Sequence, residues 1–160
     1  MEDEDKNSGM DTKIFKKAFA ENCKALNLEK FKTSFFIESN DSIVFLILRK
    51  SGYSTTYYLR VKTDLKPLEE DFDREKYIKH DICDIFLSID TELLELFDLE
   101  NELSNELRLE KMQVFFKNNV ANWIEILLSK QKIIEVFTKE NYFLLPYTKS
   151  KLGIEEKKEM

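Results

Sequence analysis

The stretch SIVFLILRKSGYSTTYYLRVKTDL, residues 42–65, contains two β-strand patterns around a short polar break. Residues 42–49 are mostly β-branched or apolar, which predicts a central strand covered on both faces. Residues 55–65 alternate instead between an apolar face and a polar face. We expect the break, residues 51–54, to be a hairpin connection in which Gly52 adopts a positive φ and Tyr53 is exposed.

The polar face of residues 55–65 carries Tyr58, Arg60, Lys62 and Asp64. An antiparallel sheet commonly packs one face on the core and leaves the other in water. We therefore expect these four side chains to meet solvent and the opposite face to pack under helices.

Apolar periodicity predicts helices before and after this stretch. The first begins after an N-cap at Asp11 or Thr12 and continues to about residue 28. A long helix over residues 102–130 carries an apolar stripe on which Trp123 should be largely buried. Further apolar segments follow at residues 133–137 and in NYFLLPY, residues 141–147. Shorter patterns predict strands at residues 31–38 and 81–89, a loop with a short helix at 68–79, and a short helix near 92–97.

These elements define a single α+β domain with an N-terminal helix, an antiparallel sheet of about four strands and a long C-terminal helix packed on one face. We place the domain at residues 11–148, after a disordered acidic tail (1–10) and before a charged flexible tail (149–160). A chain of 160 residues with 42% hydrophobic residues can bury one core of its own.

Cysteine content and hydropathy indicate a reducing compartment. Cys23 and Cys83 are 60 positions apart in a chain that starts with acidic residues, so we expect two buried, reduced thiols. No apolar run reaches the ~18 to 20 residues of a spanning helix. The expectation is a cytoplasmic protein without membrane association.

The motifs that usually carry catalysis or cofactor binding are weak in this sequence. The break at Gly52 precedes a strand, whereas a phosphate-binding loop needs several glycines and a helix after it. His80 lies near Cys83 and Asp84, but alternation in a strand would let at most two of these neighbours converge. We therefore expect His80 to mark the start of a strand at the rim of the sheet. The sequence predicts no catalytic residues, no metal site and no cofactor.

The charge distribution is more informative than any motif. Residues 64–110 contain 16 acidic and 5 basic residues, whereas residues 11–63 contain 5 acidic and 10 basic residues. An acidic region of this kind can steer a basic partner, and the net charge of −6 argues against nucleic-acid binding. The candidate binding residues are Glu69, Glu70, Asp71, Asp73, Glu92 and Glu95, with Tyr53 as an aromatic anchor.

The order of features resembles a bacterial family, the one filed as domain of unknown function 4304. The similarity lies in a leading helix, an F-x-x-x-x-F-F-I strand, a strand ending in LRKSGYS, then YYLRV, and a closing helix with Trp123. Arg49-Lys50-Ser51 stands where members have a Q-K-S-like triplet, with Arg in place of Gln. The resemblance covers about residues 11–135 and implies a compact α+β domain without established catalytic residues.

The chain is also similar in size and acidity to the small immunity proteins that neutralise bacterial toxins by plugging the active site. The first hypothesis is therefore an immunity-type inhibitor that occludes a basic toxin through its acidic surface. The second is an enzyme with a pocket between the sheet and the long helix. The third is a homo-oligomeric scaffold subunit, indicated by apolar side chains left exposed on the last helix.

Overall fold

The computed structural model describes residues 11–80, 83–87, 94–139 and 144–154, and its centre is a five-stranded antiparallel sheet in the order β1-β2-β3-β4-β5. The strands are β1 (Glu29–Phe31), β2 (Ser34–Glu38), β3 (Ser42–Lys50), β4 (Tyr57–Leu65) and β5 (Ile85–Leu87). The α+β class is confirmed. The fifth strand arises because residues 31–38 are not one strand: Lys32 has a φ of 57° and turns the chain, so that Phe31 pairs with Ser34.

The connection between β3 and β4 is a hairpin, as predicted. The Ser51 amide donates to the Thr56 carbonyl at 2.8 Å, and Tyr53 at the tip is fully exposed. The predicted positive φ at Gly52 is wrong, because Gly153 is the one glycine of the described residues with such a φ. The connection over residues 51–56 is longer than a two-residue hairpin turn, and it reverses the chain without a residue of positive φ. A hydrogen bond from the Ser54 hydroxyl to the Thr56 hydroxyl stabilises it.

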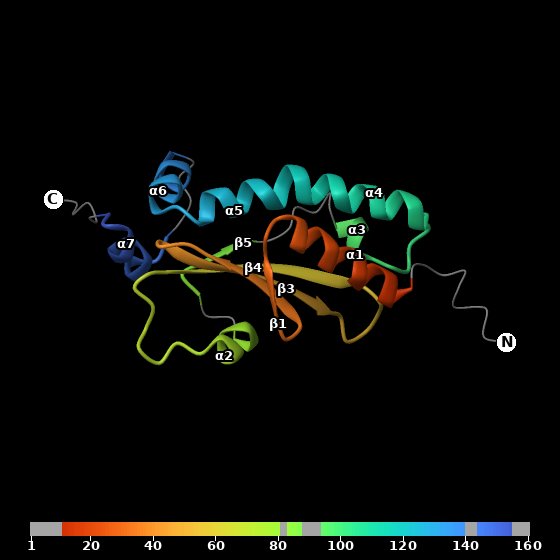
Figure 1. Ribbon diagram of the computed structural model, residues 1–160, viewed down its shortest axis with the longest axis horizontal. Coiled ribbons are helices and arrows are strands. Elements are labelled where there is room, and N and C mark those ends of the chain that lie inside the picture. The colour runs from red at the N-terminus through yellow and green to blue at the C-terminus, as the bar shows by residue number, and fades with distance from the viewer. Residues whose placement is uncertain (1–10, 81–82, 88–93, 140–143, 155–160) are drawn as a thin grey trace.

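Most of the helices cover one face of the sheet, which we call the inner face (Figure 1). They are α1 (Thr12–Ala25), α3 (Leu94–Phe97), α4 (Asn105–Phe115), the π-helix η3 (Phe116–Val120), α5 (Ala121–Leu127) and α6 (Lys130–Lys139). Asp11 caps α1 by accepting from the Lys13 amide at 2.7 Å. None of the helices in the described ranges is both long and apolar enough to cross a lipid bilayer.

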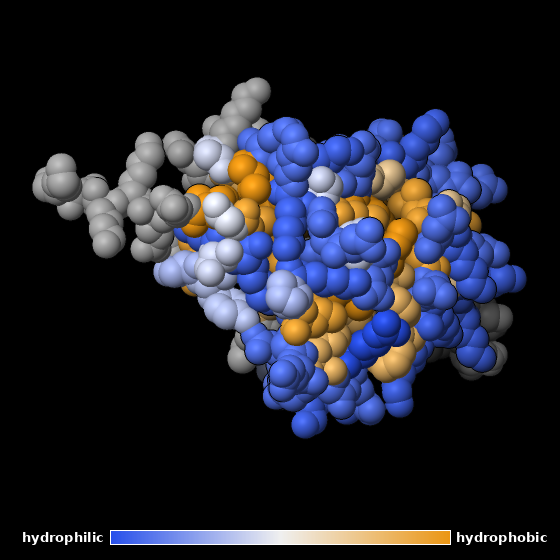
Figure 2. All heavy atoms as spheres, turned by 60° about the vertical axis from the view of Figure 1, so that its left-hand side comes forward, coloured by the Kyte–Doolittle hydropathy of each residue, from blue (hydrophilic) through white to orange (hydrophobic). Residues whose placement is uncertain are grey.

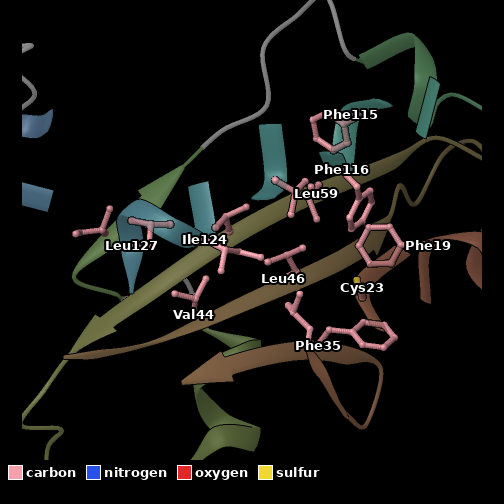
Figure 3. Packing of buried hydrophobic residues seen from close by; sticks show 14 of the residues in the cluster. Phe19, Cys23, Phe35, Val44, Leu46, Leu59, Phe115, Phe116, Ile124 and Leu127 are labelled. Atoms are coloured by element: carbon pink, nitrogen blue, oxygen red, sulfur yellow. The ribbon is translucent and has the colours of Figure 1, made fainter. Parts of the chain in front are cut away.

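Aromatic side chains form much of the core on the inner face (Figure 3). Phe19 of α1 lies edge-on to Phe35 of β2 and to Phe116 of η3, with ring centroids 6.0 and 5.3 Å apart. Cys23, on the same face of α1, is fully buried and free. Edge-to-face contacts of this kind add to the stability gained by burial alone.

The π-helix η3 explains why Trp123 is not buried as predicted. The segments α4, η3 and α5 follow one another without a break and form the long helix expected from the sequence. A π-turn inserts one extra residue into the helix, and so delays the apolar stripe by one position. Ile124 is therefore 6% exposed in the core, whereas Trp123 is partly buried at its border, edge-on to Phe115 at 5.7 Å.

The outer face of the sheet is covered by the short helix α2 (Arg74–Lys79) over a second buried cluster. This cluster comprises Phe36, Ile43, Phe45, Ile47, Tyr77 and Ile78. The prediction that the polar face of β4 meets solvent is consequently wrong at two positions. Lys62 is completely buried and Asp64 is 9% exposed, because α2 and the segments around it lie over the end of β4.

The C-terminal helix α7 (Pro146–Leu152) adds a further element at this end of β4. The domain boundary expected after residue 148 falls inside this helix. Thr148 donates to the Asp84 carbonyl at 3.0 Å, and Lys151 donates to the Leu65 carbonyl at 3.0 Å. These contacts join α7 to the sheet, so the described part of the expected charged tail, residues 149–154, belongs to the folded domain. The acidic tail expected at residues 1–10 lies outside the described residues.

Candidate functional site

Two basic side chains from the sheet bind the C-terminal end of α2. The Lys62 ammonium donates to the carbonyls of Tyr77 and His80, and the Arg49 guanidinium donates to those of Ile78 and Lys79 at 2.8 and 3.2 Å. The last carbonyls of a helix lack partners within the helix and carry partial negative charge. Lys62 and Arg49 satisfy four consecutive carbonyls, which fixes α2 on the outer face.

A carboxylate pair lies beside this end of α2. The Asp64 carboxylate accepts from the Asp84 amide at 3.0 Å and from the Tyr77 hydroxyl at 3.4 Å. The Asp84 carboxylate accepts from the Leu65 amide at 2.8 Å and from the Lys151 ammonium at 2.9 Å. The side chains of Lys151 and Asp84 are only 9% and 6% exposed. The Lys151 ammonium therefore hydrogen-bonds to one carboxylate of the pair, Asp84, and its charge also favours the ionised form of Asp64.

Burial and the second carboxylate affect the protonation of Asp64. Burial and, after it, the nearby Asp84 carboxylate together raise the pKa of Asp64 to about 6, although the hydrogen bonds and Lys151 oppose the shift. Desolvation and a like charge both disfavour the ionised form of a carboxyl group. Asp64 consequently changes charge in the range of pH 5 to 7.

A hollow of about 420 Å³ opens next to this pair, between α2, α7 and the loop that precedes α2. Figure 2 views the molecule from a side where patches of hydrophobic residues lie exposed between hydrophilic residues. Acidic and aromatic side chains dominate the wall of the hollow. The described residues that line it are Asp64, Glu69, Asp71, Phe72, Asp73, Lys76, Tyr77, His80, Cys83, Asp84, Leu145, Tyr147, Thr148 and Lys151.

His80 and Cys83 both line this hollow, contrary to the expectation from strand alternation. His80 is the C-cap of α2 and not the start of a strand, because β5 begins only at Ile85. The Cys83 thiol donates to the Ile85 carbonyl at 3.3 Å, and burial raises its pKa to about 11. A protonated thiol is a poor nucleophile, so Cys83 is not activated for covalent chemistry. Among the described residues, no group of three or more His, Cys, Asp and Glu is arranged to hold a metal ion.

The structure brings four of the predicted acidic residues together in one loop. Glu69, Glu70, Asp71 and Asp73 are all exposed, and all but Glu70 line the hollow. Asp73 also caps α2 by accepting from the Glu75 amide at 2.9 Å, and Glu69 accepts from the Tyr147 hydroxyl. Within the described part of the chain, Glu70 and Asp71 form no hydrogen bond or ion pair.

The other predicted binding residues lie elsewhere or outside the described ranges. Glu95 belongs to α3 on the inner side of the sheet and pairs with Lys111 at 3.3 Å. Tyr53 precedes β4 and the acidic loop follows it, so the nine residues of this strand, about 30 Å at ~3.4 Å each, separate them. Glu92 lies outside the described residues. The five acids that the structure describes and Tyr53 therefore do not form one surface.

Sequence reasoning missed Lys62, Asp64, Tyr77, Tyr147 and Lys151 as members of the site. Lys62 and Asp64 were assigned to solvent because their strand alternates cleanly. The signal for their burial was the sequence of β3. Both faces of this strand are apolar, so the outer face of the sheet also needs a covering layer. The sequence alone did not show that α2 and α7 supply part of this layer.

A scan against models of protein families found no matching family, and searches of the curated proteins and of the solved structures found no match.

Proposed function

We propose that this protein is a non-catalytic binding domain whose acidic loop, residues 69–73, docks on a basic partner protein. The observation that carries the proposal is a pair of exposed carboxylates, Glu70 and Asp71, that have no partner among the described residues. Asp71 lines the hollow, whose described wall contains five acids and two lysines, and Glu70 precedes it in the chain. Exposed charges without internal partners are available for a partner and attract opposite charge over about 8 Å at physiological salt.

The wall of the hollow fits a lysine or arginine side chain of that partner. Phe72, Tyr77 and Tyr147 contribute aromatic rings to the wall that also carries the carboxylates of Glu69 and Asp71. The rings of Tyr77 and Tyr147 already hold the Lys62 and Lys151 ammonium groups, 4.3 and 4.9 Å from their centroids. A cation gains energy from the face of an aromatic ring as well as from a carboxylate. Occlusion of a basic toxin active site, as by an immunity-type inhibitor, is the form of binding that we propose for this arrangement in a cytoplasmic protein.

The enzymatic alternative has one feature in its favour, the polar hollow around His80. The hollow lies on the outer side of the sheet, not between the sheet and the long helix as that hypothesis requires. Cys83 lacks activation, and the Lys62 ammonium is engaged by two carbonyls at the end of α2. These observations favour binding over covalent catalysis.

The test uses a panel of basic toxin nuclease domains as probes and measures their association rates with the immobilised protein. The variant carries Glu70→Lys and Asp71→Lys, which remove no internal hydrogen bond of the described residues. The matched control carries Glu21→Lys and Glu29→Lys, two exposed acids of α1 and β1 with the same total change in charge.

We expect the loop variant to slow association by about tenfold or more at low salt and the control to change it far less, because charges at the interface act mainly on the on-rate. The effect should shrink as salt rises. Equal rates for the two variants, or no binding by any basic probe, would contradict the proposal. Retained inhibition of a probe nuclease by the His80→Ala and Cys83→Ser variants would separate occlusion from catalysis.

A further inference from the structure

A second hollow, of about 300 Å³, lies between α3 and α4 on the other side of the sheet. Leu96 and Phe115 are buried in its floor, whereas Leu107 and Val114 are 42% and 52% exposed. Residues seven apart lie almost directly above one another on an α-helix. Leu107 and Val114 therefore form an apolar stripe on the solvent side of α4.

Charges of opposite sign flank this stripe. At 100° per residue, Glu110 lies on one side of the line through Leu107 and Val114, and Lys111 lies on the other side. Both charged residues are exposed and line the hollow. Lys111 pairs within the chain with Glu95 at 3.3 Å, but the two side chains are 46% and 57% exposed. An exposed pair of this kind contributes little and can exchange partners.

We infer that the partner of this surface is a second copy of the same chain. A two-fold axis parallel to α4 brings the two α4 helices side by side in the same direction. Each residue of the stripe then meets its own copy, Leu107 on Leu107 and Val114 on Val114. The side with Glu110 faces the side of the second copy with Lys111, and the reverse contact forms symmetrically.

The charge pattern selects this arrangement over the antiparallel one. In an antiparallel two-fold pair, like sides face each other, so Glu110 would oppose Glu110 and Lys111 would oppose Lys111. In the parallel pair both contacts are between opposite charges, because a two-fold axis repeats the Glu110–Lys111 contact with the two copies exchanged. Because the apolar contact comprises only two side chains per copy, the dimer is weak and depends on protein concentration.

The inference is independent of the acidic loop, and the test measures self-association of the full chain by analytical ultracentrifugation. We expect a concentration-dependent dimer between about 1 and about 500 µM protein. Leu107→Ser should weaken the dimer by about tenfold or more, because it removes the apolar contact at the centre of the interface. Leu145→Ser is the matched control, since Leu145 is 50% exposed but lines the other hollow.

Charge complementation tests the orientation. Glu110→Lys alone and Lys111→Glu alone should each weaken self-association, because each places like charges at both contacts. A mixture of the two variants should associate as tightly as the parent, because the heterodimer restores opposite charges at both contacts. A parent that stays monomeric throughout the range, or an unaffected Leu107→Ser variant, overturns the inference. Failure of the mixture to recover overturns the parallel arrangement.

Discussion

Replacement of Asp64 by asparagine should stabilise the protein at pH 7 and above and leave its stability unchanged at pH 4. The amide side chain would retain an oxygen that accepts from the Asp84 amide, as the Asp64 carboxylate does at 3.0 Å. It would lack the charge that competes with Asp84 for Lys151. The substitution therefore isolates the electrostatic cost of the second carboxylate.

The magnitude follows from the pKa of Asp64, which is raised from 3.8 to about 6 by burial and by Asp84. The folded state binds the Asp64 proton more tightly than the unfolded state does. Proton binding therefore stabilises the parent protein fully below pH ~4, and this contribution is lost as pH rises through about 6. Two pH units correspond to about 3 kcal/mol. Because the carboxylate borders an open hollow where solvent screens it, we expect about 1 to 2 kcal/mol.

The assay is urea unfolding of the parent and of Asp64→Asn at pH 4, 5, 6, 7 and 8, with the free energy of unfolding extrapolated to water. The difference between the two proteins should be near zero at pH 4 and reach its full value above pH 7. Asp71→Asn, on the exposed loop, is the control and should show no such trend. A difference that does not change with pH would refute the assignment of this cost to Asp64.

The remaining predictions concern the core, the end of α2 and the thiols. Ile124→Ala should lower the free energy of unfolding by about 2 to 5 kcal/mol, and Trp123→Ala by less, because the π-turn places Ile124 and not Trp123 in the core; the reverse order in urea unfolding would contradict this account. Lys62→Met should cost about 1 to 3 kcal/mol, because it leaves two carbonyls at the end of α2 without their donor; unchanged stability would show that water replaces the ammonium. A thiol reagent at pH 8 should label Cys83 slowly and Cys23 only after unfolding. Labelling of Cys83 should accelerate as the pH approaches about 11, the raised pKa of this thiol. Rapid labelling of Cys23 in the native protein would argue against its burial.

Local sequence signals determined most of the elements on the inner face. Asp11 at the N-cap, the alternation in β4 and the apolar stripe of the long helix each depend on neighbours within a few residues. Such patterns encode the period of a helix or strand directly. The α+β class, the hairpin at residues 51–56 and the exposure of Tyr53 were predictable for that reason.

Predictions failed where the outcome depends on residues distant in sequence. The burial of Lys62 depends on α2, and the ordering of Lys151 depends on Asp84, 67 positions earlier. The sequence does not show whether the hydrogen-bonding groups of a polar side chain on a strand bind water or the end of a helix. The position of Trp123 depended on a single π-turn, which apolar periodicity does not reveal.

The sequence by itself determined a single acidic α+β domain, its central hairpin and the acidic loop at residues 69–73. Only the tertiary structure decided which charges are available to a partner. Asp73 caps a helix, Glu95 pairs with Lys111, and Glu70 and Asp71 extend beside a hollow without a partner in the described residues. The physical reason is that a charge becomes structural or available according to its neighbours in space, and these are set by packing between elements far apart in the chain.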